Sequence, residues 1–391
     1  MMNKLHVANF GPIKDGTVEF GDLTVLVGQQ ATGKSLVVQL VKAISDAGAI
    51  RANLKQYGFE WLKGEAVANY STLYFGGGLQ DLLTKITALS ADGKALSAKG
   101  LAKPPSRVSS AETVFLVPAQ RVLVLQDGWP KPFMAYLSGD PYSMRRFSDA
   151  LRTVMDDFSV DAPVFPQPNK LMSTLRTAID RSIYAGFELR METQGQRKQL
   201  LLTPRGGVAG LPLNAWSAGQ REFTPLLFSL YWLMPPSKVS RRGDLDHVII
   251  EEPEMGLHPQ AIVSFMLIVL SLLHRGYRVT LSTHSPVVLD VVWAVSNLRD
   301  LKRADAVSAL RKIFELPAKD AQIRGTLETA LQKSYRTYFF ERKVGEVTIQ
   351  DISTLDPGAN DENVNGWGGL SGFSGRIADI VGDARTRAGV A

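Results

Sequence analysis

Short apolar runs rich in β-branched residues alternate with longer amphipathic stretches along the chain. Runs of the first kind predict strands, and apolar residues three and four positions apart predict helices. The expected strands are residues 5–10, 17–20, 23–27, 114–117, 189–191, 199–203, 248–250, 277–282, 335–341 and 346–352. The expected helices are residues 34–47, 142–156, 170–185, 214–233, 260–273, 304–314 and 321–333, and Gly48 is expected to end the first of them. This alternation predicts an α/β fold.

Residues 28–35 read Gly-Gln-Gln-Ala-Thr-Gly-Lys-Ser, the pattern of a phosphate-binding loop. Gly28 and Gly33 let successive backbone N–H groups around Gln30 point at a phosphate, and the following helix adds its positive end. Lys34 is placed to reach the β- and γ-phosphates, and Ser35 to bind Mg²⁺. An ordinary turn is the plain alternative, but a strand before the loop and a helix after it favour phosphate binding.

Two later strands are expected to end in residues that carry chemistry. Glu251 and Glu252 follow the apolar run 248–250, and adjacent carboxylates at a strand end are costly without a cation nearby. His284 follows the strand 277–282. A lone histidine is usually a surface or core residue, yet its place at a strand end, in step with the acids, favours a function.

Ser217 lies in the segment that opens the predicted helix 214–233. Its hydroxyl is well placed to cap the helix by accepting a backbone N–H of the first turn, and capping alone would explain the residue. The helix N-terminus that it caps is also an anion site, able to meet a phosphate held by another chain.

Composition and charge exclude only a few classes of protein and site. The 391 residues are 45% hydrophobic and contain no cysteine, which excludes disulfides and thiolate metal sites and suits a reducing cytoplasm. No secretion signal and no apolar run long enough for a bilayer are seen, so a cytoplasmic protein without a membrane partner is expected. The net charge of +6 is compatible with DNA. The basic candidates are Arg145 with Arg146, Lys238 with Arg241 and Arg242, and residues 99–107, although solvated surface charge is the plainer reading of each.

Four motifs stand in a fixed order: the phosphate loop, Ser217-Ala218-Gly219-Gln220, residues 250–254 (Ile-Glu-Glu-Pro-Glu) and residues 282–286 (Ser-Thr-His-Ser-Pro). Together they resemble the ABC-type ATPases of the RecF, SMC and OLD group. The resemblance is greatest to short OLD-like ATPases of bacterial anti-phage defence operons, of which PARIS-type ATPase subunits are one example. It covers about residues 3–46, 113–125 and 199–292.

The resemblance implies a role for each matching residue. Lys34 and Ser35 would bind the phosphates and Mg²⁺ of ATP. Glu251 would lie near the metal, where the family usually has Asp. Glu252 would be the catalytic base that orients the attacking water, and His284 would contact the γ-phosphate.

The second motif has a different implied role. Ser217, Gly219 and Gln220 correspond to a signature motif that completes the nucleotide site of a second subunit, although Ala218 replaces the usual second glycine. The family's glutamine loop is expected near Gln120, Arg121 or Gln126, and Gln120 is preferred. A homodimer or higher homo-oligomer that shares its ATP sites is therefore expected.

The implied fold is a P-loop NTPase of the α/β class, with an ABC-type head, a mostly helical inserted subdomain and a small C-terminal α+β extension. The expected division has three core segments, 1–48 with the phosphate loop, 113–135 with the glutamine-loop region, and 199–292 with the signature, acids and histidine. An insertion (49–112), the helical subdomain (136–198) and the C-terminal extension (293–391) complete it.

Three functions follow from the resemblance. The first is an ATPase that acts as a nucleotide-dependent sensor or scaffold and controls a separate effector in anti-phage defence. The second is a RecF-like repair ATPase that clamps or loads on DNA, and the third is an ATP-locked oligomeric binding module with little turnover. After His284 no Asp-x-Asp cluster of an OLD-type nuclease appears, so any nuclease or toxin activity is expected in a partner. The absence of a long heptad repeat argues against an SMC-like tether.

Overall fold

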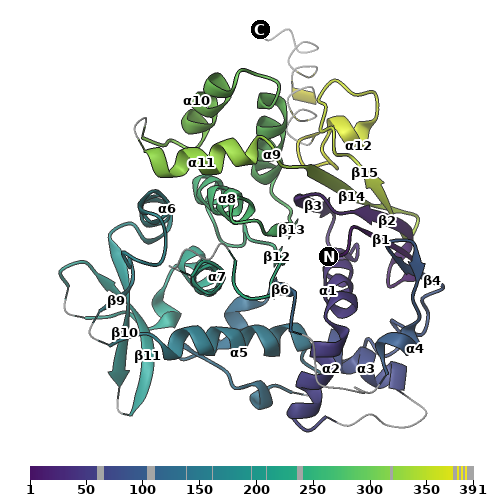
Figure 1. The fold of residues 1–391 in the computed structure, drawn as a ribbon, viewed down its shortest axis with the longest axis horizontal. Coiled ribbons are helices and arrows are strands. Elements are labelled where there is room, and N and C mark those ends of the chain that lie inside the picture. Colours follow the sequence, from purple (N-terminus) through teal and green to yellow (C-terminus); the bar gives the residue numbers. More distant parts are fainter. Residues whose placement is uncertain are drawn as a thin grey trace.

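The computed structural model describes residues 1–59, 66–103, 111–137, 139–160, 162–194, 196–207, 209–235, 241–317, 320–372, 377, 380–381 and 384. A mixed sheet runs through the molecule in the order β5-β4-β1-β2-β15-β14-β3-β13-β12-β6 (Figure 1). Its strands are β1 (Lys4–Phe10), β2 (Ile13–Glu19), β3 (Leu23–Gly28), β4 (Ala88–Ala91), β5 (Lys94–Ala95), β6 (Val114–Val117), β12 (His247–Glu251), β13 (Arg278–Ser282), β14 (Tyr335–Lys343) and β15 (Glu346–Asp351).

The centre of the sheet is parallel and buried on both faces. β14, β3, β13, β12 and β6 all pair in parallel, so their carboxyl ends meet at one edge. Alternate residues of β3 enter different cores: Leu23, Val25 and Val27 join one, and Leu26 joins the other. Strands covered on both sides read as continuous apolar runs, which is why the sequence pattern located them.

Helices cover both faces. The core that contains Leu26 is closed by α1 (Lys34–Ser45), α2 (Ala47–Gln56), α3 (Ala66–Phe75) and α4 (Ala98–Leu101). The opposite core is closed by α5 (Tyr142–Asp156), α6 (Ser173–Ile179), α7 (Ala218–Leu233), α8 (Pro259–His274), α9 (Pro286–Leu298), α10 (Arg303–Ile313) and α11 (Ala321–Ala330). A short helix, α12 (Glu362–Asn365), follows the last strand.

A smaller antiparallel sheet lies at one side of the molecule, beside α5 and α6 (Figure 1). It consists of β9 (Pro163–Phe165), β10 (Phe187–Gln194) and β11 (Arg197–Pro204). The hairpin β10–β11 was predicted. The segment 136–198 therefore combines its helices with strands. A separate two-stranded hairpin, β7 (Leu125–Gln126) with β8 (Trp129–Pro130), follows a 3₁₀ turn, η1 (Arg121–Val124).

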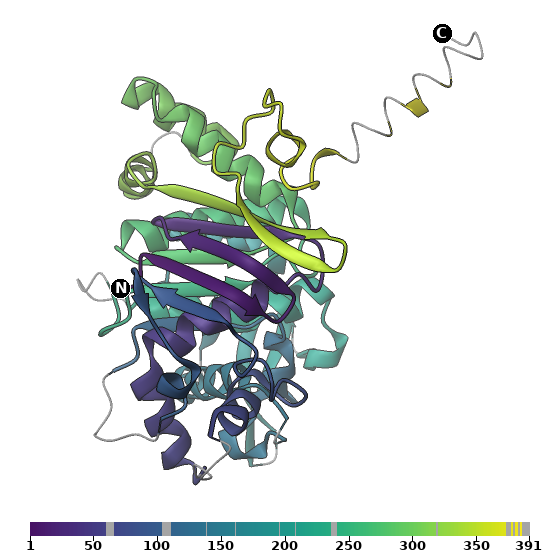
Figure 2. The ribbon, with the colours of Figure 1, turned by 90° about the vertical axis from the view of Figure 1, so that its right-hand side faces the viewer.

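The hairpin β14–β15 lies inside the large sheet. β14 pairs in parallel with β3, and Phe340 stands opposite Gly28 at the start of the phosphate loop. Figure 2 shows this hairpin crossing beside the first two strands of the chain. The two strands were predicted from their apolar alternation, but their place within the central sheet was not.

Two local predictions were wrong. Gly48 does not end the first helix: α1 ends at Ser45, and Gly48 lies inside α2. The break falls at Asp46, whose buried carboxylate accepts the backbone N–H groups of Thr113 and Val114 and the ammonium of Lys42. The helix predicted over 170–185 is α6 followed by a wider π turn over residues 180–184.

The segment 49–112 was expected to lie outside the core. Its strand β4 instead pairs with β1 and extends the large sheet, because Leu89 brings an apolar side chain to the core that also contains residues of β1.

Within the described residues, no helix is long and apolar enough to cross a membrane.

Candidate nucleotide-binding site

The phosphate loop joins β3 to α1 at the carboxyl edge of the sheet. Gly28 has φ 144° and Gly33 has φ 92°, a region that side chains disfavour. A Cβ on Gly28 would lie 2.7 Å from the carbonyl oxygen of Phe340, and one on Gly33 would lie 3.1 Å from Pro12. Both positions thus require glycine, and both bring the loop backbone close to its neighbours.

Lys34 is held inside the loop. Its side chain is buried, and its Nζ donates to the carbonyl oxygens of Gly28 at 2.8 Å and Gln29 at 2.9 Å. Burial lowers the pKa of Lys34 to about 8, while the charges of Glu252 and Glu254 oppose that shift. The ammonium is therefore still charged near neutral pH and is positioned to bind an anion.

Glu251 ends β12 and is buried, with 1% of its surface exposed. Its Oε1 atom has no hydrogen-bond partner. Burial raises the pKa of Glu251 to about 7, against the lowering influence of the Ser35 hydroxyl, and the charge of Glu252 raises it further. A buried carboxylate oxygen without a partner is costly, which indicates that a cation belongs here.

Glu252 has an unusual backbone conformation for a residue with a side chain, with φ 43°. Its backbone N–H donates to the carbonyl of Ser282 on β13 at 2.8 Å. Its carboxylate oxygen Oε1 lies 3.7 Å from Nε2 of His284, and both side chains are partly open to solvent. The turn thus directs the second acid away from the core and into the space before the loop.

His284 follows β13, and a third acid fixes its backbone. The N–H of His284 donates to Oε1 of Glu254, whose other oxygen has no partner. Burial and the charge of Lys34 lower the pKa of His284, against the opposing charge of Glu252, which favours the neutral imidazole. Burial raises the pKa of Glu254. A neutral imidazole can donate one hydrogen bond to a phosphate oxygen and accept another.

These groups face one open pocket of 360 Å³. Its walls are Pro12, Gln30, Ala31, Thr32, Gly33, Lys34, Ser35, Leu36, Glu252 and His284. The structure therefore brings together the predicted loop residues, Glu252 and His284. Glu251 lies behind this wall, within reach of the Ser35 hydroxyl.

The residues fit a Mg²⁺ ion that is bound together with a nucleotide. Ser35 and Glu251 would supply one oxygen each, and the unpaired Oε1 of Glu251 is the observation that supports the fit. No group of three or more metal-ligating side chains occurs in the described part of the chain. A site with only two protein ligands, Ser35 and Glu251, suits Mg²⁺, because this ion keeps several waters and takes phosphate oxygens as its remaining ligands.

The motif Ser217-Ala218-Gly219-Gln220 lies elsewhere. Ser217 caps α7: its Oγ accepts the N–H of Gln220 at 3.3 Å, and Gln220 Oε1 accepts the N–H of Ser217 at 3.1 Å. A Cβ on Gly219 would lie 2.8 Å from the carbonyl oxygen of Gly256, so this glycine is needed for packing within the chain. None of the four residues is among those that line the phosphate-loop pocket.

The three candidates for the glutamine loop have different surroundings. Gln120 and Gln126 are exposed, and neither is among the residues that line the phosphate-loop pocket. Arg121 is fully buried and reaches the backbone of Glu251 and Glu252. The preference for Gln120 therefore has no support from geometry, and Arg121 is the residue of this segment that contacts the acidic turn.

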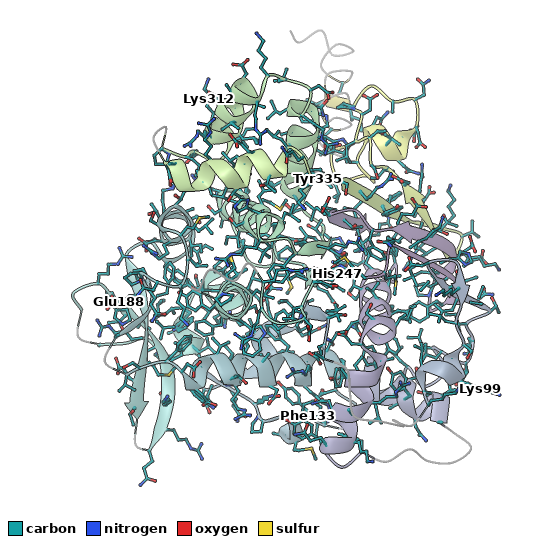
Figure 3. The ribbon with its side chains drawn as sticks, in the orientation of Figure 1. Lys99, Phe133, Glu188, His247, Lys312 and Tyr335 are labelled. Atoms are coloured by element: carbon teal, nitrogen blue, oxygen red, sulfur yellow. The ribbon has the colours of Figure 1, made fainter. Side chains whose placement is uncertain are left out.

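Three of the basic candidates for DNA contact other groups of the chain. Arg145 is buried and donates to the backbone of Asp140 at 3.2 Å. Arg146 pairs with Glu112 at 2.9 Å. Arg242 lies over the ring of Trp232. Lys238 and residues 104–107 lie outside the described residues, whereas Lys99 is exposed at the periphery (Figure 3).

Two residues of the site were given no role by the sequence. Glu254 was visible as the third acid of residues 250–254, but its contact with the histidine loop depends on the sheet order, which brings β12 beside β13. Arg121 was visible only as one of three candidates, and its burial between two distant segments has no signal in the sequence.

The mixed α/β fold, with a phosphate loop at the carboxyl edge of its parallel strands, is similar to the folds of P-loop NTPases of the ABC and SMC type. The family model described as "AAA domain, putative AbiEii toxin, Type IV TA system" matches residues 143–290, a stretch that contains the signature motif, the acids and His284 but not the phosphate loop. No curated protein matches the chain.

Several solved structures are similar over most of the chain at low identity. An SMC head bound to the C-terminal winged-helix domain of ScpA shares 9% identity, covering 90% of this chain and 97% of that one, with a TM-score of 0.40. The SMC head domain of Thermotoga maritima shares 13%, covering 90% and 98%, with a TM-score of 0.33. A bacterial ABC transporter cassette, titled as a dimeric structure, shares 10%, covering 73% and 89%, with a TM-score of 0.33.

Proposed function

We propose that the protein is an ATPase that binds MgATP at the phosphate loop and hydrolyses it. The observation that carries the proposal is the convergence of Lys34, Glu252 and His284 on one pocket, in front of a buried Glu251 with an unpaired oxygen. A turn that only joins a strand to a helix would not need the ammonium of Lys34 or the carboxylates of Glu251 and Glu252 at this edge of the sheet.

Each side chain has a part in the reaction. Lys34 and the loop amides bind and orient the phosphates. Glu252 orients the attacking water and accepts its proton, and His284 donates a hydrogen bond to the γ-phosphate. Mg²⁺, held by Ser35 and Glu251, would neutralise charge on the phosphate oxygens. Catalysis of this kind rests on positioning and electrostatics.

We further propose that ATP turnover controls a separate effector in anti-phage defence. The name of the matching family, which refers to an AbiEii toxin of a type IV toxin–antitoxin system, supports a role in toxin control or abortive infection. In this proposal two copies share each nucleotide, and the exposed residues Ser217 and Ala218 at the N-terminus of α7 meet the phosphate held by the other copy.

Two substitutions test the ATPase proposal. Lys34→Ala removes the charge that faces the phosphates and should abolish detectable binding of a fluorescent ATP analogue. Glu252→Gln should leave binding within about threefold and lower the hydrolysis rate by about 100-fold, since the loss falls on water activation. Titration of the analogue beside a phosphate-release assay separates these effects.

The exposed residues Lys85 and Glu192 do not line the pocket, so Lys85→Ala and Glu192→Gln provide controls. Both should bind and hydrolyse ATP like the wild type. Hydrolysis by Glu252→Gln at the wild-type rate would show that another group activates the water.

A further inference from the structure

Arg121 occupies a position between two segments that are far apart in sequence. It begins the η1 turn after β6, and its side chain has 0% of its surface exposed. Its Nε donates to the carbonyl oxygen of Glu222 on α7 at 2.9 Å. Its Nη1 and Nη2 donate to the carbonyl oxygens of Glu251 at 3.0 Å and Glu252 at 3.1 Å.

The three bonds use the planar geometry of the guanidinium group. One rigid fork spans the second turn of α7 and the strained turn that ends β12, and a lysine could not reach all three carbonyl oxygens with the same geometry. The carboxylate of Glu222 lies 3.7 Å from Nη2 and supplies a counter-charge. A buried charge of this kind is maintained because several groups satisfy it.

A second contact joins the same two segments. Gly219 in the first turn of α7 packs directly on the carbonyl of Gly256, four residues after Glu252. The beginning of α7 and the acidic turn are therefore linked by a close backbone contact and by the guanidinium of Arg121. Glu252 is the residue most sensitive to this linkage, because its φ of 43° persists only when its surroundings hold it.

We propose that Arg121 is a positioning residue: by linking α7 to the acidic turn, it fixes the orientation of Glu252 and thereby sets the rate of hydrolysis. The inference rests on the proposed ATPase function and extends it. Arg121 is not among the residues that line the phosphate pocket, so its role is to fix the backbone from which the Glu252 carboxylate projects.

The test compares Arg121→Lys and Arg121→Met with the matched pair Arg145→Lys and Arg145→Met. Arg145 is also a buried arginine that donates to backbone carbonyl oxygens, but it lies away from the acids, against the rings of Phe59 and Phe133. Turnover per folded molecule and affinity for a fluorescent ATP analogue are measured for all four variants on the full chain.

Arg121→Met should lower kcat by about 100-fold. Arg121→Lys keeps the charge and should lower kcat by only about tenfold. Both variants should bind the ATP analogue with an affinity within about threefold of the wild type. Both Arg145 variants should keep kcat within about twofold. Glu222→Gln should lower kcat by about threefold, and its effect should shrink in the Arg121→Lys background, because the two residues form one unit.

If Arg121→Met does not fold, Arg121→Lys and Glu222→Gln carry the test. Wild-type kcat in Arg121→Lys, or a loss of kcat that matches an equal loss in the Arg145 variants, would overturn the proposal while leaving the ATPase function intact. A wild-type protein that binds the analogue through Lys34 but releases no phosphate would overturn both.

Discussion

His247 is a buried titratable residue at the start of β12, in the middle of the molecule (Figure 3). Its Nε2 shares a hydrogen bond with Thr280 at 2.8 Å, and its ring meets the edge of Phe20. Burial, and then the positive charges of Arg278 and the N-terminus, lower the pKa of His247 to about 3. It therefore supports the fold only as a neutral group.

This shift predicts a pH-dependent stability. Below about pH 6.5 the unfolded chain binds a proton at His247 that the folded chain does not, so the free energy of unfolding falls as pH falls. Between about pH 7.5 and pH 5 this residue should account for a loss of about 2 kcal/mol. Urea unfolding of His247→Gln across this range should show a shallower decline than the wild type.

The partly exposed His6, which pairs with Asp15, provides a histidine variant for comparison. The decline of stability with falling pH should be shallower in His247→Gln than in His6→Gln. An equal slope for wild type and His247→Gln would mean that other groups cause the whole decline.

Among the elements, the hairpin β14–β15 has a strained turn. Val344 and Gly345 connect its strands, and both have positive φ, 44° and 87°. Two-residue turns of this form favour Asn-Gly, whereas a β-branched residue is strained there. The Val344 side chain is fully exposed and has no packing to lose.

Val344→Asn should therefore raise the free energy of unfolding by about 1 kcal/mol. Chemical denaturation measures the change. Val344→Thr adds polarity but keeps the β-branch, so it should bring no comparable gain. Stabilisation by Thr equal to that by Asn would trace the effect to polarity and not to the backbone.

Some elements could be predicted from the sequence because a local pattern determines them. The central strands β3, β6, β12 and β13 are apolar runs, since both of their faces are buried. The break between α1 and α2 could not be foreseen, because the carboxylate of Asp46 binds amides 67 and 68 residues further along the chain. The place of β14 beside β3 depends on a pairing that no local pattern encodes.

The same distinction applies to the site. Lys34 and Ser35 belong to one continuous motif whose spacing already defines a phosphate loop. Glu252 and His284 were predicted at strand ends, and their place beside the nucleotide was implied by the resemblance of the four motifs to ABC-type ATPases. The contacts of Arg121 with Glu222, Glu251 and Glu252 span up to 131 residues, and only the folded packing shows them.

At the scale of the whole molecule, the proposed sharing of nucleotides predicts complementation. Lys34→Ala disables the loop, and a bulky Ser217→Arg blocks the start of α7. In a mixed dimer one site carries both lesions and the other is intact. An equal mixture should regain about a quarter of the wild-type ATPase rate, and ATP should increase the mass measured by light scattering.

A mixture of Lys34→Ala with the double variant Lys34→Ala/Ser217→Arg has no intact site and provides the control. If subunit exchange is confirmed and the first mixture regains no more activity than this control, each nucleotide is bound by one chain alone.

The pairing of β14 with β3 also determines when during synthesis the phosphate loop can reach its final structure. β3 and the phosphate loop leave the ribosome early, yet the neighbour that completes one side of β3 begins at Tyr335. At translation rates of roughly 5–20 residues per second, the loop waits for tens of seconds with that side of its strand unpaired. During this interval the nascent chain exposes a strand edge to other proteins and lacks the Phe340 carbonyl that packs against Gly28. A nascent or prematurely terminated chain should therefore be inactive, so the activity would begin only when nearly the whole sequence has been made.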